Sequence, residues 1–140
     1  MPQSTVHPCM ELFEREIERF RRFARQRSTS QPPTWRRKSR RYHRSWPLLI
    51  ATCERSCVQE YSAALHDACD DGIGFMTDHM FEVGEVVYLQ LFWHEAGALR
   101  IPAVVRHVNP TPQGILVGCE YALANLDACE AALLMEQCCS

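Results

Sequence analysis

The sequence predicts a mostly β protein, a six-stranded antiparallel β-barrel with a helix at each end. Six short apolar-rich runs follow one another at near-regular spacing and are separated by turn residues, a pattern typical of a small all-β barrel. The runs cover residues 46–54, 57–66, 73–77, 85–93, 99–108 and 115–121. A chain of 140 residues can bury enough apolar surface to need neither a metal nor a disulfide for its core.

The N-terminal segment, residues 1–28, is predicted to be an amphipathic helix from about residue 9 onwards. Apolar residues recur there at spacings of three and four, and glutamates precede arginines along the segment, an order that suits the helix dipole. The apolar residues are Met10, Phe13, Ile17, Phe20 and Ala24. This face must pack on something, and the pattern allows either the body of the same chain or a helix of a partner protein.

Residues 29–44 form a basic linker or arm. Residues 1–44 hold 12 basic and 4 acidic residues, a net +8, whereas residues 45–140 hold 3 and 13, a net −10. The whole chain therefore carries only −2. Such an arm attracts phosphate groups, or it folds back on the acidic body of its own chain.

The C-terminal part is predicted to end in a helix over about residues 123–138. Leu126, Cys129, Leu133 and Gln137 fall on one face of that helix. Before it, residues 109–114 contain two prolines and a glycine and are expected to form the turn between the last two strands.

The eight cysteines are expected to stay reduced. The start of the chain lacks the pattern of a secretory signal, there is no CxxC pair, and no second pair stands at zinc-finger distance from Cys53 and Cys57. Cys53, Cys119 and Cys129 occupy positions where an apolar residue would serve, so we predict that they fill the core. No disulfide framework and no metal site are predicted.

The sequence argues against two further classes of protein, membrane-spanning proteins and enzymes. The longest near-continuous apolar stretch, residues 46–53, is too short to span a membrane, and a cytoplasmic location is expected.

No GxSxG, P-loop, HExxH or GxGxxG motif is present. His66 and Asp67 could form a catalytic pair with Cys69, but neighbours on a strand point to opposite faces, so we expect His66 and Asp67 to diverge. The protein is predicted not to be an enzyme.

Two separated elements carry the functional signal. The first is the run Arg40-Arg41-Tyr42-His43-Arg44, immediately before the first strand. The second is the acidic segment 66–72, expected at the turn between the second and third strands and ending in Gly72. At the end of a small barrel, arginines of the arm would meet this turn.

Residues 36–121 resemble a PilZ domain. That family is recognised by RxxxR before the first strand and by [D/N]xSxxG after the second. In this chain Arg40 to Arg44 match the first motif, and Asp67 to Gly72 match the second except that Cys69 replaces the serine. The part of the family pattern that follows these motifs also fits. It includes Gly84, the run that ends at Arg106, and a glycine followed by an aromatic residue in the last strand. The resemblance implies a PilZ-like barrel over 36–140, C-terminal helix included, that binds cyclic di-GMP without catalysing a reaction.

The resemblance also implies a set of ligand-binding residues. They are Arg40, Arg41, Arg44, Asp67, Cys69, Gly72 and Arg106. Arginine suits both phosphate oxygens and guanine edges, and a carboxylate at Asp67 can accept from guanine N1 and N2 hydrogens. Gly72 allows either a close backbone approach or a positive φ.

The register and stoichiometry of the arginine motif stay open. Arg36 with Arg40, and Arg37 with Arg41, also fit RxxxR, and we prefer Arg40 with Arg44 because Arg44 abuts the first strand. In the family, an arginine before the motif favours a stacked ligand dimer, but Ser39 stands there in this chain.

The leading hypothesis is a bacterial cyclic di-GMP receptor whose basic arm becomes ordered on ligand binding and which signals through a protein partner. The 9–28 helix is the expected partner surface, and a homo-oligomer is compatible with the sequence. The alternative is a degenerate PilZ-like adaptor that does not bind the nucleotide, with Cys69 as its sign. A nucleic-acid-binding barrel is disfavoured because the strands are acidic and lack basic-aromatic stripes.

Overall fold

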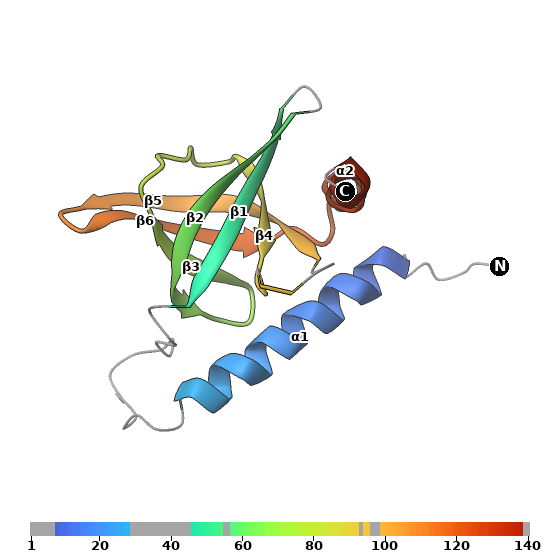
Figure 1. Ribbon diagram of the computed structural model, residues 1–140, viewed down its shortest axis with the longest axis horizontal. Helices are drawn as coiled ribbons and strands as arrows, with labels where there is room; N and C mark the ends of the chain where they lie inside the picture. The colour runs from blue at the N-terminus through green and yellow to red at the C-terminus, as the bar shows by residue number, and fades with distance from the viewer. Residues whose placement is uncertain (1–7, 29–45, 55–56, 93, 96–98, 139–140) are drawn as a thin grey trace.

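The computed structural model describes residues 8–28, 46–54, 57–92, 94–95 and 99–138 (Figure 1). Its elements, in chain order, are α1 (Pro8–Ser28), β1 (Pro47–Glu54), β2 (Cys57–Ala68), β3 (Gly72–Thr77), β4 (Val86–Gln90), β5 (Arg100–Thr111), β6 (Gly114–Tyr121) and α2 (Leu126–Cys138). The prediction of a mostly β protein with a helix at each end is confirmed.

The six strands close into one antiparallel barrel. Neighbours around it follow the order β1-β2-β3-β6-β5-β4, and every pair is antiparallel. Closure leaves no free sheet edge among these strands, so each strand pairs with a neighbour on both sides. The predicted six-stranded antiparallel barrel is confirmed, and its interior is filled by apolar side chains such as Ile50, Phe75, Leu89 and Val117.

The predicted turn over 109–114 is wrong, because β5 continues through most of it. Asn109, Pro110 and Thr111 pair with residues of β6, and only Pro112 and Gln113 lie outside the strands. The hydroxyl of Thr111 donates to the carbonyl of Gly114 at 2.7 Å, and it accepts from the amide of Gln113 at 3.2 Å. The hydroxyl therefore secures the hairpin end, where a proline that lacks an N–H can be tolerated.

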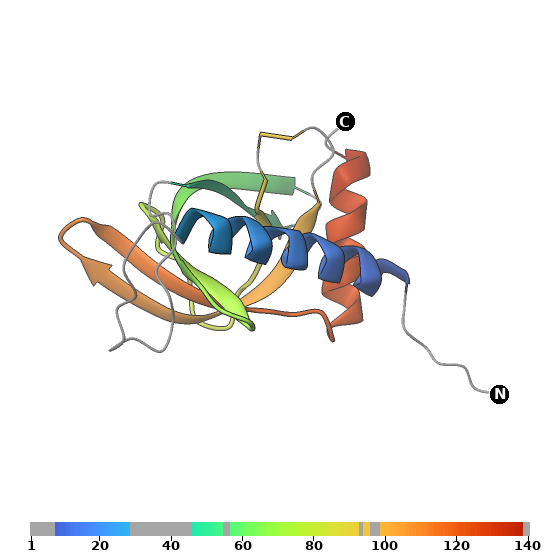
Figure 2. The ribbon, with the colours of Figure 1, turned by 90° about the horizontal axis from the view of Figure 1, so that it is seen from below.

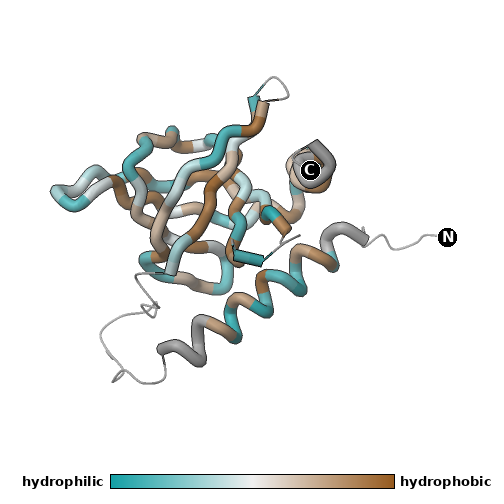
Figure 3. Tube along the Cα trace, viewed as in Figure 1, coloured by the Kyte–Doolittle hydropathy of each residue, from teal (hydrophilic) through white to brown (hydrophobic). Residues whose placement is uncertain are grey.

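Helix α1 packs its apolar face on the barrel of its own chain. Phe13, Ile17 and Phe20 are buried in the same core as the barrel residues, whereas the side chains of Met10 and Ala24 lie outside the described ones. Figure 2 shows α1 lying across the barrel, and hydrophobic and hydrophilic residues alternate along it in Figure 3. The amphipathic helix is confirmed, and of the two alternatives for its apolar face the structure shows packing on the body of the same chain.

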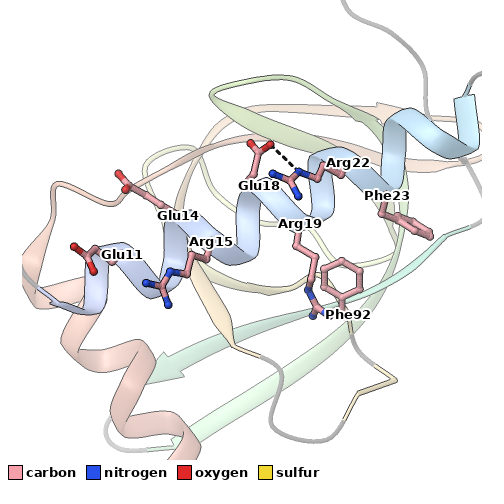
Figure 4. Close-up of a pocket in the computed structure, with 8 residues that line it drawn as sticks. All are labelled: Glu11, Glu14, Arg15, Glu18, Arg19, Arg22, Phe23 and Phe92. Atoms are coloured by element: carbon pink, nitrogen blue, oxygen red, sulfur yellow. Dashed lines mark hydrogen bonds and ion pairs between the residues drawn. The ribbon is translucent and has the colours of Figure 1, made fainter.

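The rear half of α1 is joined to the barrel by aromatic and charged contacts. The ring of Phe23 lies 4.4 Å from that of Trp46 and 6.0 Å from that of Phe92, measured between centroids. The guanidinium of Arg19 lies 3.9 Å from the centre of the Phe92 ring and donates to the Glu95 carboxylate at 2.6 and 3.1 Å. Hydrogen bonding from Arg19 lowers the pKa of Glu95. Figure 4 shows Arg19 reaching toward Phe92 from the helix.

Helix α2 begins with a side-chain cap and buries a face of small residues. The side-chain oxygen of Asn125 accepts from the amide of Ala128 at 3.1 Å, which satisfies a free donor at the helix start. Ala128, Cys129 and Ala132 are buried, but Leu126 is 48% exposed. The prediction that Leu126 lies on the buried face was therefore wrong, because the helix turns Ala128 and Ala132 toward the core.

Two of the three predicted core cysteines are buried. Cys119 and Cys129 lie in the core, and burial raises the pKa of Cys119 to about 12, so its thiol stays protonated and unreactive. Cys53 is exposed, which contradicts the prediction. It pairs with Val58 one residue before the end of β1, beyond the part of the strand that faces the interior. All cysteines for which the structure describes a side chain are free thiols.

Candidate functional site

The acidic motif is split between a strand end and a short turn. Strand β2 extends through Ala68 and β3 begins at Gly72, so the turn comprises only Cys69, Asp70 and Asp71, fewer residues than predicted. The amide of Cys69 donates to the carbonyl of Gly72 at 2.9 Å, which closes the turn. The amide of Tyr121 donates to the carbonyl of Asp71 at 2.8 Å and fixes the turn to the end of β6.

His66 and Asp67 lie on the same side of the sheet, contrary to our expectation. The pairing of β2 with β3 shifts register between Leu65 and Asp67, which marks a β-bulge. A bulge inserts an extra residue and re-aims the following side chain, so the alternation on which our expectation rested is broken. The Nδ1 atom of His66 lies 3.7 Å from a carboxylate oxygen of Asp67, and the Asp67 side chain is 33% exposed. The carboxylate is therefore accessible to a ligand.

A glycine in β3 makes room for the Asp67 carboxylate. Asp67 pairs with Gly74, and a Cβ atom added at Gly74 would lie 2.5 Å from Oδ1 of Asp67. Gly74 in turn pairs with Gly118 of β6, which pairs with His107 of β5. Two glycines thus separate Asp67 from His107 along one row of the outer barrel surface. We did not predict this row, although the spacing of Gly72 and Gly74 in one strand was a signal for it.

Gly72 is required for a close backbone approach. A Cβ atom at this position would lie 1.9 Å from the carbonyl oxygen of Cys119 and 2.9 Å from the Cα of Glu120, both of which are backbone atoms of β6. Among the described glycines, positive φ values belong to Gly84 and Gly114, not to Gly72. Of the two roles that the sequence allowed for Gly72, the structure selects the close approach.

Cys69 is exposed at the turn. Its thiol donates to the carbonyl of Gly72 at a sulfur-to-oxygen distance of 3.5 Å. Its exposure shows that Cys69 is not an apolar residue that fills the core beneath the turn. The third position of the motif therefore presents a polar atom at the turn.

Arg106 lies close to the turn through a shared partner. It sits at the register shift of β5 between Val105 and His107, and its Nε donates to a carboxylate oxygen of Glu120 at 2.9 Å. Glu120 pairs with Gly72. The structure thus brings Asp67, Cys69, Gly72 and Arg106 to one end of the barrel. Arg40, Arg41 and Arg44 lie outside the described residues.

Neither a metal-binding cluster nor a membrane-spanning helix is found within the described ranges. No group of three or more His, Cys, Asp or Glu side chains there is arranged to hold a metal ion. Neither described helix is both long and apolar enough to cross a membrane.

Comparison with known families identifies the domain that carries this turn. The model of the PilZ domain matches residues 36–138. The chain belongs to the PilZ domain family. Members of this family are typically non-catalytic receptors that bind cyclic di-GMP, and Asp67, Cys69 and Gly72 stand at the positions of its [D/N]xSxxG motif. This PilZ chain departs from the motif at Cys69.

Two solved structures of MrkH from K. pneumonia are similar to this PilZ chain. One, in the apo state, is 17% identical and the other, a P2(1) crystal form, is 16% identical, each with a TM-score of 0.42. Each match covers 76% of this chain and 49% of MrkH, so the chain spans about half the length of that protein. A search of curated proteins gave no match.

Proposed function

We propose that this PilZ chain is a non-catalytic cyclic di-GMP receptor that binds its ligand at the β2–β3 turn and signals through a protein partner. The observation that carries the proposal is the arrangement of Asp67, Cys69 and Gly72 at one end of a PilZ barrel, with the carboxylate of Asp67 exposed beside the turn. That carboxylate can accept the N1 and N2 hydrogens of a guanine base.

The path of the chain supports a meeting of the two motifs. The carbonyl of Trp46 accepts from the amide of Leu65 at 2.8 Å, two residues before Asp67. Arg44 is two residues before Trp46, and consecutive Cα atoms are about 3.8 Å apart, so its Cα lies within about 7.6 Å of that of Trp46. A long arginine side chain from that position can reach a ligand at the turn.

Arginine matches the chemistry of the ligand. Its planar guanidinium donates to two phosphate oxygens, or to O6 and N7 of guanine, and its face stacks on a base. The cyclic dinucleotide carries two phosphates and two guanines, so Arg40, Arg41 and Arg44 have complementary groups to contact. Arg106, which pairs with Glu120 next to Gly72, would add a further cation near the turn.

Signal transfer would follow from ordering of the basic arm. Binding would fix residues between α1 and β1 at the turn, and a partner would recognise the changed surface. The partner surface cannot be the apolar face of α1 as long as that face is packed on the barrel. A bacterial cytoplasmic location and a homo-oligomer stay predictions from the sequence.

A degenerate PilZ adaptor that does not bind nucleotide is the second candidate, favoured by the thiol in place of the motif hydroxyl at Cys69. Calorimetric titration of the full chain with cyclic di-GMP separates the two functions, with GTP and a short DNA duplex as control ligands. Saturable binding of cyclic di-GMP alone supports the receptor. The absence of any heat of binding would refute it and leave the adaptor.

The exchange Asp67→Ala is expected to weaken cyclic di-GMP binding by about tenfold. It removes a carboxylate acceptor for guanine but keeps the arginine contacts, and a hydrogen bond to a charged group is worth about 1.5 kcal/mol, close to a factor of ten. The same titration measures the effect. Asp71→Ala is the matched control, since it removes a carboxylate from the same turn, and it should bind at least as tightly as the parent. Equal affinities of parent and Asp67→Ala would make the motif only a structural turn.

The exchange Cys69→Ser is expected to fold normally and to bind cyclic di-GMP as well as the parent or up to about tenfold more tightly. The thiol is exposed and donates to Gly72, and a hydroxyl can make the same bond while being the stronger donor and acceptor. Thermal melts and titrations of the two proteins test this. A large fall in melting temperature with weaker binding would remove Cys69 from the site.

A further inference from the structure

A pocket lies between α1 and the motif turn. It has a volume of about 540 Å³, within the range of small-molecule sites, and Arg21 of α1 faces Asp70, Asp71, Glu120 and Tyr121 across it. Only the side of the pocket formed by the barrel belongs to the residues that match the PilZ model, because Arg21 precedes residue 36. The helix therefore adds a wall, and a cation, to the end of the barrel that carries the motif.

Two hydrogen-bond donors among the pocket residues are buried and unused. The Nε of Arg21 and the hydroxyl of Tyr121 have no hydrogen-bond partner within the described part of the chain. Burial raises the pKa of Tyr121 above its usual range, so its hydroxyl keeps the proton. Buried polar groups in folded proteins nearly always have a partner. Both groups can donate, so what they lack is an acceptor.

The ion pairs of Arg21 leave its guanidinium available. Its Nη1 lies 3.7 Å from a carboxylate oxygen of Asp70 and 3.6 Å from one of Glu18. Charge-assisted N–H to O bonds are normally about 2.7–2.9 Å long. The two carboxylates thus hold the guanidinium at the turn by charge without forming close hydrogen bonds with it.

We infer that Arg21 is a phosphate-binding residue of the cyclic di-GMP site and that α1 thereby contributes to ligand affinity. The inference rests on the proposed function. A phosphate oxygen supplies the acceptor that the pocket lacks, and it forms a closer contact with the guanidinium than Asp70 does. The positive charge also matters. The other charged residues that line the pocket are all acidic and would repel a dianion, namely Glu14, Glu18, Asp70, Asp71 and Glu120, so Arg21 is the one cation among the described lining residues that can attract a phosphate.

The contact would also connect the ligand to the helix. Ile17 and Phe20, one turn before Arg21 and beside it, are buried against the barrel. A ligand that draws Arg21 away from Asp70 would pull on the helix that carries these core contacts, so occupancy of the site and the position of α1 would be coupled.

Arg22 provides a matched control. It follows Arg21 on the same helix and carries the same charge, but its side chain is 73% exposed and its Nε lies 3.3 Å from the carboxylate of Glu18. Figure 4 shows Arg22 directed toward Glu18. It is not among the residues that line the pocket at the turn.

The test is calorimetric titration of the full-length parent, Arg21→Ala and Arg22→Ala with cyclic di-GMP, after thermal melts have shown that each is folded. Arg21→Ala should bind at least about tenfold more weakly, the loss expected for one charge-assisted bond, whereas Arg22→Ala should stay within about threefold of the parent. Equal affinities of the two variants would overturn the role of Arg21 while leaving the receptor function intact. A parent that does not bind refutes the receptor function itself, and this inference with it.

Asp70→Asn tests the same contact without removing the arginine. It leaves the turn in place but frees Arg21 from a competing carboxylate, so cyclic di-GMP should bind more tightly than to the parent. Unchanged or weaker binding would mean that Arg21 and Asp70 do not compete in this way, and the assignment to Arg21 would be wrong. This variant also decides the question if Arg21→Ala does not fold.

Discussion

The exchange Gly72→Ala is expected to destabilise the barrel by about 3 kcal/mol, at the upper end of the cost of overpacking, and to lower the melting temperature by about 10 °C. A Cβ atom at residue 72 would lie 1.9 Å from the carbonyl oxygen of Cys119. That oxygen belongs to the backbone of β6, so no side-chain rotation relieves the clash and the paired strands must separate. Chemical or thermal denaturation measures the loss.

The matched control for this exchange is Gly118→Ala in the neighbouring strand. The nearest atom to a Cβ there is Cδ2 of the exposed His107 ring, at 3.3 Å, and a side chain can move aside. The control should cost about 1 kcal/mol or less. If the two alanine variants melted at the same temperature, close approach of the backbone would not be the reason for a glycine at position 72.

The architecture of the barrel could be predicted because it depends on patterns within short segments. Each strand alternates or runs apolar over a few residues, and turn residues separate the strands, so all six were found from residues 46–121 alone. Their ends were less predictable. Strand β5 passes through Pro110 because a hydroxyl at Thr111 closes the hairpin, a contact with no counterpart in the local pattern.

The candidate site was predictable only where a motif marks it. Asp67, Cys69 and Gly72 could be named from their spacing, and the structure places them at one strand end and turn. The bulge at His66 could not be foreseen, because it arises from the pairing of β2 with β3. Gly74 was missed for the same reason, since its role is visible only once Asp67 is known to lie opposite it.

The contribution of α1 to the site was beyond the reach of the sequence. Arg21 is one of several arginines in the rear half of the helix, and nothing in the periodicity separates it from Arg22. The two differ only because Phe13, Ile17 and Phe20 dock the helix in one rotation, which turns Arg21 toward Asp70 and leaves Arg22 outside. Tertiary packing, not composition, selects the residue.

The exchange Arg44→Ala is expected to weaken cyclic di-GMP binding by about 100-fold or more, while the melting temperature stays within a few degrees of the parent. The estimate follows from the loss of a bidentate, charge-assisted contact to phosphate or guanine, worth about 3 kcal/mol. Arg44 precedes the first residue of β1 by three positions, so its removal should take away ligand contacts and not core packing. Titration and thermal melts of parent and variant give both values.

Arg36→Ala and Arg37→Ala control for the general charge of the arm. Each removes one positive charge from the same segment, so a purely electrostatic attraction would make all three variants equally weak. We expect the two controls to lose much less affinity than Arg44→Ala. Unchanged binding by Arg44→Ala, with a loss in one of the controls, would instead place the motif at Arg36 and Arg40 or at Arg37 and Arg41. The ligand would then meet the arm farther from β1, and the short reach from Trp46 to Asp67 would no longer support the site.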